Sequence, residues 1–595
     1  MGASDVTRLD ECLSIHGGRL LLEECDCVEL ARRFGTPLYV VSEDQLRRNA
    51  RAFVSAFADA WPEGPTRILP SIKANFTLAL RRILTEEGLG CDVFGRSELE
   101  AALRGGVSPG LISLNGSVKG DALLARAVSL GVRITLDSVA EIERVREIAR
   151  RDGVVARVRF RLRPDLTDLS VPSDLFDGSV TIGEATQLYK PGIPTDEPLE
   201  AGRGAVEAPE LDAVGVMVHV GRHGADPDIW RRLARATVGI VAELREAWNG
   251  WQPRELDLGG GFPMPRDPTG RSLEHRRGET APAPPLATYA AALTETLREE
   301  LRAAGFDSAG LALEVEPGRG LYGNAGIHLS TVLNVKRQTA PVTLAWAETD
   351  TSEVFVPDIV FEHSRFPLVV ANRADEDATT HMAIVGSSCN FDILDPAAAV
   401  PALTPGDVLA FLDTGAYQDA GASNFNALPR PATVLVRGGR ADVVKRAETT
   451  ADVFARDVVP ARLDHVSVTC ADLDRSLAFY RDLLGIPVID RGRSDAPYIA
   501  RITGIEGAVR WADLDVGGSH VLELLEFQAG DPAPAHISVA VPNAADVHER
   551  LVAAGVPVRS EPVVVDEEGD WLGAKCFYAE DPDGFIIELV QRPDE

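Results

Sequence analysis

The chain has 595 residues, of which 45% are hydrophobic and 25% are charged, and its formal net charge is −30. This length exceeds what one hydrophobic core supports, so we expect two to four domains. The acidic balance argues against nucleic-acid or anionic-membrane partners, because both bind basic surfaces. No signal-peptide pattern or membrane-length apolar run is present, and the seven scattered cysteines indicate no disulfide framework. We therefore expect a cytoplasmic protein.

Eight short apolar runs alternate with amphipathic segments between about residues 65 and 325. This alternation predicts parallel strands joined by helices, and eight units of this size predict a (β/α)8 TIM-like barrel. Two stretches, Leu166–Pro209 and Arg266–Pro285, break the pattern and are interpreted as irregular insertions. The eight predicted strands are Ile68–Ser71, Cys91–Val93, Leu111–Leu114, Arg133–Leu136, Ala156–Leu162, Gly215–Val220, Glu255–Leu258 and Leu311–Val315.

The rest of the chain predicts a β-domain and a duplicated module. Short β-like runs follow the barrel, and the last 135 residues contain an internal repeat whose two halves begin with Asp464-His465 and Ala535-His536. Each half is expected to be a βαβββ unit. The predicted boundaries are 1–45 for an N-terminal segment joining the β-domain, 46–325 for the barrel, 326–446 for the β-domain, 447–460 for a linker and 461–595 for the paired βαβββ domain.

Polar residues capable of cofactor chemistry follow several of the predicted barrel strands. A lysine such as Lys73 can form a Schiff base with an aldehyde if its pKa is lowered. The Gly259-Gly260-Gly261 run exposes backbone N–H groups suited to phosphate. Glu316 can pair with a protonated pyridine nitrogen, and Arg319 can bind phosphate or carboxylate. Because strands of a barrel end at one face, these residues predict one site.

These motifs resemble those of the pyridoxal-phosphate-dependent amino-acid decarboxylases of fold type III, the diaminopimelate, ornithine and arginine group, over the first 445 or so residues. The resemblance implies pyridoxal 5′-phosphate as cofactor, decarboxylation as the reaction and a homodimer with shared active sites. It assigns Lys73 to the aldehyde, His219 to ring stacking and Cys389 to proton delivery. It implies cofactor contacts from Arg161, His219, Gly259, Gly260, Gly261, Glu316, Arg319 and Tyr417, the last within Gly415-Ala-Tyr417.

The sequence departs from that family where substrates are selected. The acid that usually follows the cysteine is Asn390, the next acid is Asp392, and Arg222 stands where a serine is usual. The usual Lys-Phe-Gly reads Lys190-Pro-Gly192. We take Arg222, Asn390 and Asp392 as substrate residues and expect an acidic or polar substrate in place of a diamine precursor.

The internal repeat places His465 and His536 on the first strand of each half, and Glu523 and Glu588 on the last. Two imidazoles and two carboxylates suit Zn, Ni, Co, Mn or Fe(II). Glu526 is the competing ligand in the first half. Glu523 is preferred because it repeats the apolar-Glu-Leu pattern around Glu588.

Residues 461–592 resemble the vicinal oxygen chelate superfamily, which includes glyoxalase I, epimerases and extradiol dioxygenases. The resemblance implies a metal that chelates substrate oxygens, and a His/Glu/His/Glu set is similar to the isomerase, epimerase and lyase members. We therefore predict a bifunctional enzyme of specialised metabolism that acts on a small molecule. The alternatives are a pyridoxal-phosphate-dependent racemase, and a C-terminal module that only binds ligands or confers resistance.

Overall fold

The computed structural model describes residues 11–170, 179–194, 198–219, 221, 226–265, 283–362, 364–457, 462–518, 520–528, 535–567, 571–581 and 584–593. The chain forms two compact units, Met1–Phe454 and Ala455–Glu595, and the boundary falls inside the predicted linker. None of the described helices is long and apolar enough to cross a bilayer.

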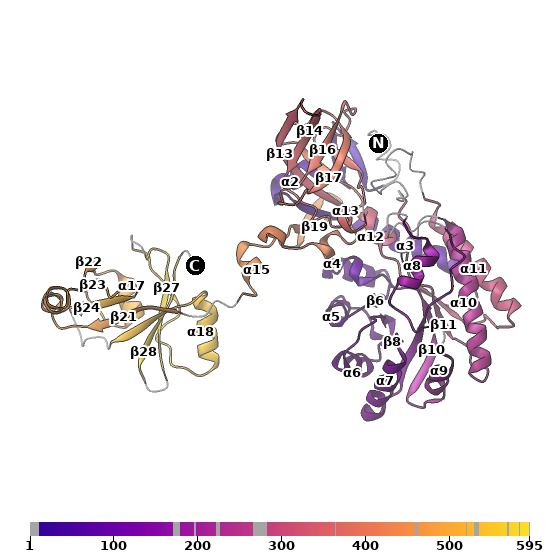
Figure 1. The fold of residues 1–595 in the computed structure, drawn as a ribbon, viewed down its shortest axis with the longest axis horizontal. Helices are drawn as coiled ribbons and strands as arrows, with labels where there is room; N and C mark the ends of the chain where they lie inside the picture. The colour runs from indigo at the N-terminus through magenta and orange to yellow at the C-terminus, as the bar shows by residue number, and fades with distance from the viewer. Residues whose placement is uncertain are drawn as a thin grey trace. The chain divides into compact units, whose positions relative to one another are not determined.

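The larger unit contains a parallel eight-stranded barrel (Figure 1). Every pairing along the order β5-β12-β11-β10-β9-β8-β7-β6 is parallel, and a bridge between Ser71 and Asp92 joins the two ends. The predicted (β/α)8 class is therefore confirmed. The strands are β5 (Thr66–Ile68), β6 (Cys91–Val93), β7 (Ile112–Leu114), β8 (Arg133–Leu136), β9 (Ala156–Leu162), β10 (Leu211–Val218), β11 (Glu255–Asp257) and β12 (Ala312–Val315).

The outer helices bury apolar faces against this sheet, as their amphipathic patterns require. Local signals set their ends: the Ser42 side chain caps the first turn of α3, and α7 ends at Gly153 in a left-handed conformation. The helices are α3 (Glu43–Ala60), α4 (Leu78–Glu86), α5 (Arg96–Arg104), α6 (Asp121–Leu130), α7 (Val139–Asp152), α8 (Ile182–Leu188), α9 (Pro198–Glu207), α10 (Pro227–Ala247) and α11 (Leu286–Ala303).

The prediction that Leu166–Pro209 is an irregular insertion is wrong in part, because this region contains α8 and α9. Its Gly- and Pro-rich composition conceals a capping box, in which Thr181 and Glu184 each bond the other's backbone N–H. After α8 the chain is tied to the barrel, because the Gly192 N–H donates to Asp137 over 3.0 Å. Most of the second insertion, residues 266–282, lies outside the described residues.

The β-domain of the larger unit is built from segments that precede and follow the barrel in the sequence. Strand β4 (Leu38–Ser42) precedes the barrel yet lies between β13 and β19, antiparallel to the first and parallel to the second. The other strands are β13 (Gly326–Gln338), β14 (Leu344–Thr349), β15 (Leu368–Val370), β16 (Thr380–Val385), β17 (Ile393–Val400), β18 (Val408–Phe411), β19 (Ala432–Arg437) and β20 (Arg440–Lys445).

The smaller unit is one eight-stranded sheet made of two βαβββ halves, as predicted. The first strands of the halves, β21 (Arg462–Thr469) and β25 (His536–Ala540), pair antiparallel at its centre. Each also pairs in parallel with the last strand of its own half, β24 (Val521–Phe527) or β28 (Ile586–Gln591). The remaining elements are α16 (Leu473–Leu477), a π-helix (Ala478–Leu483), β22 (Val488–Ser494), α17 (Pro497–Thr503), β23 (Val509–Asp515), α18 (Ala544–Ala553), β26 (Val563–Val564) and β27 (Lys575–Glu580).

Candidate active sites in the two units

Lys73 lies in a short 3-10 helix after β5, at the carboxyl end of the barrel strands. Its Nζ is 3.7 Å from the Asp92 carboxylate, and its side chain is 44% exposed, so an aldehyde can reach the amine. Desolvation opposes the charged form, but the Asp92 carboxylate, with Tyr417 and Glu316, raises the pKa of Lys73 above its ordinary value. A lowered pKa was the condition stated for Schiff-base formation, and the surrounding acids do not supply it. The chain's own acids therefore favour the ammonium form.

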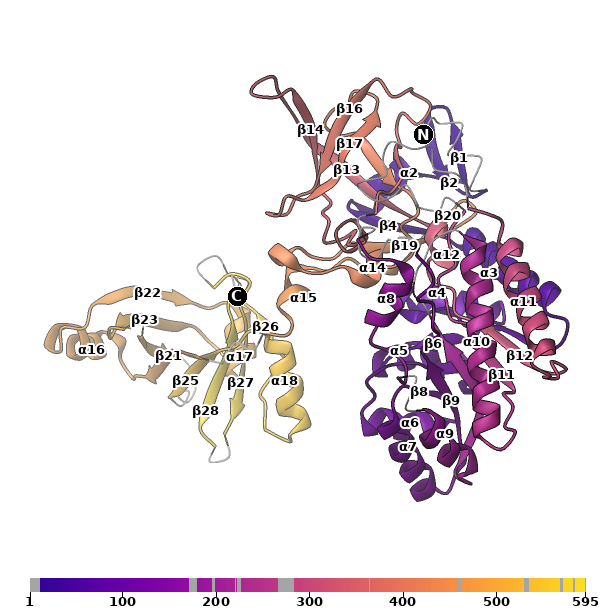
Figure 2. The same cartoon turned by 45° about the vertical axis from the view of Figure 1, so that its right-hand side comes forward.

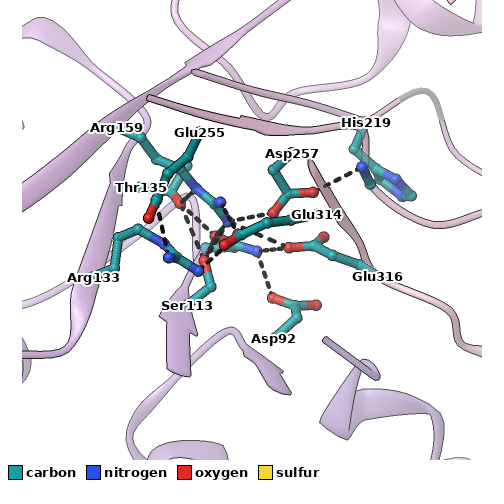
Figure 3. A network of polar contacts seen from close by, with 12 residues as sticks. Asp92, Ser113, Arg133, Thr135, Arg159, His219, Glu255, Asp257, Glu314 and Glu316 are labelled. Atoms are coloured by element: carbon teal, nitrogen blue, oxygen red, sulfur yellow. Dashed lines mark hydrogen bonds and ion pairs between the residues drawn. The ribbon is translucent and has the colours of Figure 1, made fainter. Parts of the chain in front are cut away.

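Glu316 is buried at the end of β12, opposite this lysine. The amide of Asn115 donates to Asp92 over 2.7 Å and also to Glu316, so one side chain joins the two carboxylates. Figure 3 labels both carboxylates. Burial, together with the negative charges of Asp257 and Asp92, raises the pKa of Glu316 well above its ordinary range. A cation such as a protonated pyridine nitrogen would relieve this crowding.

The glycine run packs tightly between neighbouring strands and His219. The Gly260 N–H donates to His219 Nδ1 over 3.0 Å, and the Gly259 N–H donates to Asp257 over 2.9 Å. A Cβ at Gly260 would lie 2.3 Å from the Glu316 carbonyl oxygen, so only glycine fits there. The bare backbone of this turn has the chemistry of a phosphate cradle.

Two further residues lie close to these groups. Arg161 on β9 is buried, and its Nη1 donates to the Asn115 carbonyl oxygen over 3.2 Å. Its guanidinium lies 6.0 Å from the ring of Tyr189, which directly follows α8. The Tyr189 ring also meets His219 edge to face, with centroids 6.4 Å apart. Tyr189 was not predicted, because its role depends on how α8 is placed.

Arg319 and Tyr417 form one buried group beside Lys73. The Arg319 guanidinium pairs with Asp358 over 2.7 Å and also with Glu362, and it stacks 4.9 Å from the Tyr417 ring centroid. The Tyr417 N–H donates to the Ala74 carbonyl oxygen over 2.7 Å, which joins the β-domain to the lysine segment. Arg319 is thus engaged with two carboxylates, whereas it was expected to bind phosphate or carboxylate of a ligand.

Cys389 is a free, exposed thiol on a loop of the β-domain, and its N–H donates to the Asn426 side chain over 2.9 Å. Asn390 is also exposed and donates to Glu353 over 2.8 Å. Asp392 differs from its predicted role, because it is buried and accepts the N–H groups of Glu353 and Ser388. Asp392 therefore shapes the loop. Arg222 lies outside the described residues.

The C-terminal unit gathers three of its four predicted ligands. Ligand atoms of His465, His536 and Glu588 all lie within 4.8 Å of one another, and all three residues are buried. His465 Nε2 and Glu588 Oε2 are 3.4 Å apart, yet neither atom has a hydrogen-bond partner. Buried, converging and unbonded donor atoms of these types fit a divalent cation.

Glu523 comes within 3.4 Å of His465 Nε2, although it is not a member of that compact group. Glu526 is occupied elsewhere, because it accepts from Arg510 and from the Leu473 N–H at 2.9 Å each. Asp464 accepts from His465 Nδ1 over 3.0 Å, an arrangement that orients a ligand imidazole. Desolvation opposes protonation of His465, but the hydrogen bond to Asp464 and the neighbouring glutamates raise its pKa to about 11.

Asp513 is a residue of this centre that the sequence analysis missed. It pairs across β23 and β24 with Glu523, and its Oδ1 is buried without a hydrogen-bond partner. Burial and the Glu523 charge raise the pKa of Asp513 to about 7. Only the register of the two strands brings these acids together. Strand alternation on Val509–Asp515 was the one available signal.

The fold and the two sites define a pyridoxal-phosphate-type barrel enzyme carrying a second, glyoxalase-like unit, and comparisons with known proteins agree. Residues 43–323 match the pyridoxal-binding domain of pyridoxal-dependent decarboxylases. Residues 462–589 match the glyoxalase/bleomycin resistance protein/dioxygenase superfamily.

The alignments with curated relatives span about three quarters of this chain and nearly the whole length of each relative. The diaminopimelate decarboxylase of Methanothermobacter thermautotrophicus is 31% identical over 447 residues, which are 75% of this chain and 97% of that protein. The diaminopimelate decarboxylase of Actinosynnema pretiosum is 32% identical over 74% of this chain and 93% of its own. The chain belongs to the pyridoxal-dependent decarboxylase family.

A solved structure supports the same fold. Diaminopimelate decarboxylase from M. jannaschii, in a complex with L-lysine, superposes with a TM-score of 0.66 at 26% identity, over 77% of this chain and 99% of that one. These comparisons confirm a pyridoxal-phosphate-dependent decarboxylase followed by a glyoxalase-superfamily domain.

Proposed function

We propose that the chain is a bifunctional enzyme of specialised metabolism. The barrel and β-domain decarboxylate an amino-acid-like substrate, and the C-terminal unit catalyses a metal-dependent isomerase, epimerase or lyase step on the same intermediate. One observation carries the proposal: a single chain holds two separate donor sets, one around Lys73 and Glu316 and the other around His465, His536 and Glu588.

In the barrel, bound pyridoxal phosphate supplies the electron sink for the bond that releases CO₂. The chain's residues then divide the remaining work. Lys73 would hold the aldehyde, Glu316 would accept a hydrogen bond from the protonated ring nitrogen, and the Gly259–Gly261 turn would receive the phosphate. His219 would stack on the ring, and the Cys389 thiol would supply a proton to the substrate carbon. The raised pKa of Glu316 and the tightly packed glycine turn support this fit.

We propose an acidic or polar substrate. The Tyr189 ring lies near both the buried Arg161 guanidinium and His219. This arrangement supports the choice, because the guanidinium and the phenol can bind an anionic or hydrogen-bonding group. The exposed Asn390 supports it as well, since a neutral amide does not select a distal ammonium. Diaminopimelate, the compound in the names of the relatives, serves as the reference substrate.

In the C-terminal unit, a bound divalent metal supplies Lewis-acid stabilisation of a substrate anion. His465, His536 and Glu588 would hold it, and Asp464 would orient His465 through Nδ1. Glu523 and Asp513 stand beside this group as acids available for proton transfer.

We also propose a cytoplasmic homodimer that shares its decarboxylase sites. All seven cysteines are free thiols, which suits a reducing compartment. The loop of Cys389 is exposed, and its neighbour Phe391 is 94% exposed, which suits burial by a second copy.

The test uses the purified full-length protein loaded with pyridoxal phosphate. CO₂ and amine products are measured by mass spectrometry from a panel of acidic, polar, acylated and diamine-precursor amino acids, including diaminopimelate. We expect CO₂ from acidic or polar members, its loss in Lys73→Ala, and no change in the exposed control Lys336→Ala.

Solvent deuterium entering the α-carbon without CO₂ release would replace decarboxylation by racemisation. Equal or better turnover of ornithine or lysine would overturn the proposed substrate class while leaving the decarboxylase intact. Purified protein that holds no metal, or full-length activity that chelators leave unaffected, would favour a C-terminal unit that is a metal-free binding module.

A further inference from the structure

The interior of the barrel below the cofactor residues is ionic, although such interiors are usually filled by apolar side chains. Arg133, Arg159 and Glu314 are completely buried there. Arg133 pairs with Glu255 over 2.9 Å and with Glu314 over 2.7 Å. Buried charges are costly unless each is paired, so this network requires a nearly fixed geometry.

Arg159 is the cation of this network that reaches the active site (Figure 3). Its Nη1 pairs with Glu314 over 2.6 Å, and its Nε donates to the Thr135 hydroxyl over 2.9 Å. Its Nη2 pairs with Asp257 and lies 3.6 Å from the Glu316 carboxylate. One rigid guanidinium therefore contacts both acids at the ends of β11 and β12.

Asp257 and Glu316 hydrogen-bond the residues that would contact the cofactor or lie beside Lys73. Asp257 accepts the N–H of Gly259, the first residue of the glycine turn, over 2.9 Å. Glu316 accepts from Asn115, which also binds Asp92 beside Lys73. Arg159 contacts Glu316 directly, and it contacts Asp257, which in turn binds the glycine turn. Substitution of Arg159 would therefore alter the surroundings of both Glu316 and this turn.

Asp257 and Glu316 are buried neighbours that hydrogen-bond each other, and two adjacent carboxylates resist joint ionisation. Burial raises the pKa of both groups. The Asp257 charge raises the pKa of Glu316 further, the Glu314 charge raises that of Asp257, and the Arg159 charge lowers both. Without the Arg159 charge the pKa of Glu316 would rise further, and the pair would hold a shared proton more tightly. A protonated Glu316 cannot stabilise the positive charge of a ring nitrogen.

We propose that Arg159 is a positioning residue that stabilises the ionised form of Glu316, so that this carboxylate can pair with the protonated ring nitrogen of bound pyridoxal phosphate. Its guanidinium acts from the barrel interior through Glu316, without touching the cofactor. The electron-withdrawing strength of the ring would then depend on a residue one layer below the site.

The test follows the ring nitrogen directly. Full-length protein is loaded with pyridoxal phosphate that carries ¹⁵N in the ring, and the ¹⁵N chemical shift is recorded across pH. The variants are Arg159→Met and the charge-conserving Arg159→Lys. Arg133→Met is the matched control, because it removes a buried guanidinium that pairs with Glu255 and Glu314 in the same network. Steady-state CO₂ release gives kcat and KM for each protein.

In Arg159→Met we expect the ¹⁵N shift to move from the protonated towards the neutral pyridine position. We expect kcat to fall about 10- to 100-fold, the loss usual when an outer partner of a functional ligand is removed, with a smaller change in KM. Arg159→Lys should recover part of both effects, and Arg133→Met should retain the wild-type shift.

An unchanged ¹⁵N shift in Arg159→Met would overturn the proposal, and so would an equal displacement in Arg133→Met, since the effect would then be general loosening of the barrel. If Arg159→Met does not fold, the double variant Arg159→Met/Glu314→Gln, which leaves the net charge of the buried network unchanged, is judged by the same shift. Circular dichroism and thermal unfolding verify the fold of each variant.

Discussion

Two carboxylic acids, the buried Glu316 in the larger unit and the half-buried Asp513 in the smaller one, have raised pKa values. Burial and the neighbouring Asp257 raise the pKa of Glu316, and burial and the neighbouring Glu523 raise that of Asp513 to about 7. Glu316 is linked through Asn115 to Asp92 beside Lys73, and Asp513 lies across from the predicted metal ligand Glu523. Perturbed acids beside candidate ligands are typical of functional sites.

A comparison of Glu588 on β28 with Glu526 on β24 gives a test of the metal centre. We expect Glu588→Gln to weaken divalent metal binding by about tenfold or more, because it removes a ligand charge from the group around His465 and His536. Glu526→Gln is the matched control for a ligand glutamate, since Glu526 is engaged by Arg510. Isothermal titration of chelator-treated full-length protein with Zn²⁺, Ni²⁺, Co²⁺ and Mn²⁺ measures the affinities.

The assigned ligand set would be wrong if Glu526→Gln weakened binding as much as Glu588→Gln. A parallel Glu523→Gln variant determines whether the fourth predicted residue is a ligand or a nearby acid. If Glu523 is a metal ligand, this variant binds the metal more weakly than the wild type. If Glu523 serves only in proton transfer, the metal affinity stays near that of the wild type.

At the scale of elements, helix α8 determines how the barrel site is covered. In both views α8 lies at the end of the barrel that faces the β-domain (Figures 1 and 2). Its capping box fixes where the helix starts, and the Gly192 bond to Asp137 fixes the chain after it. Tyr189, the residue between these two anchors, is thereby held beside His219 and Arg161.

Tyr189 is therefore expected to affect substrate selection more than turnover. We predict that Tyr189→Ala raises KM for the preferred substrate several-fold, about 1 kcal/mol of binding for one lost aromatic contact, and broadens the accepted panel. Leu188→Ala is the control, because the adjacent side chain is 67% exposed. Steady-state kinetics on the substrate panel measure both effects. Equal kinetic changes in the two variants would contradict a specific role for Tyr189.

At the scale of the whole molecule, the β-domain of the larger unit depends on both ends of that unit's sequence. Strand β4, which precedes the barrel, lies between β13 and β19, which follow it. Removal of the N-terminal segment would therefore open the β-domain sheet. The loop of Cys389 projects from this domain with an exposed thiol. The proposed proton delivery by Cys389 requires a substrate, which a second copy of the chain would bring to it in the proposed homodimer.

Subunit mixing tests this arrangement. Lys73→Ala and Cys389→Ala proteins are each expected to be nearly inactive. When they are unfolded together and reassembled, half of the dimers are mixed and one of their two sites has both residues, so about one quarter of wild-type activity should return. Activity that stays at the level of the separate variants would show that each site is completed within one chain. Sedimentation analysis verifies that dimers re-form.

Local sequence was sufficient for the architecture. Strand-length apolar runs that alternate with amphipathic helices predicted the barrel, and the Asp464-His465 and Ala535-His536 repeat predicted the paired βαβββ unit, because these signals depend on neighbours only a few residues apart. Site residues at the ends of strands, such as Lys73 and Glu316, could also be predicted from the sequence, because the parallel strands of a barrel end at one face.

Tertiary structure alone decided the contacts that couple distant segments. The Arg159 contacts with Asp257 and Glu316 cross 98 residues or more, and the pairing of Asp513 with Glu523 depends on strand register. The burial of Asp392 and the position of Tyr189 likewise depend on how a loop and a helix pack. Side-chain charge and burial in such places are set by the folded surroundings, which no local pattern contains.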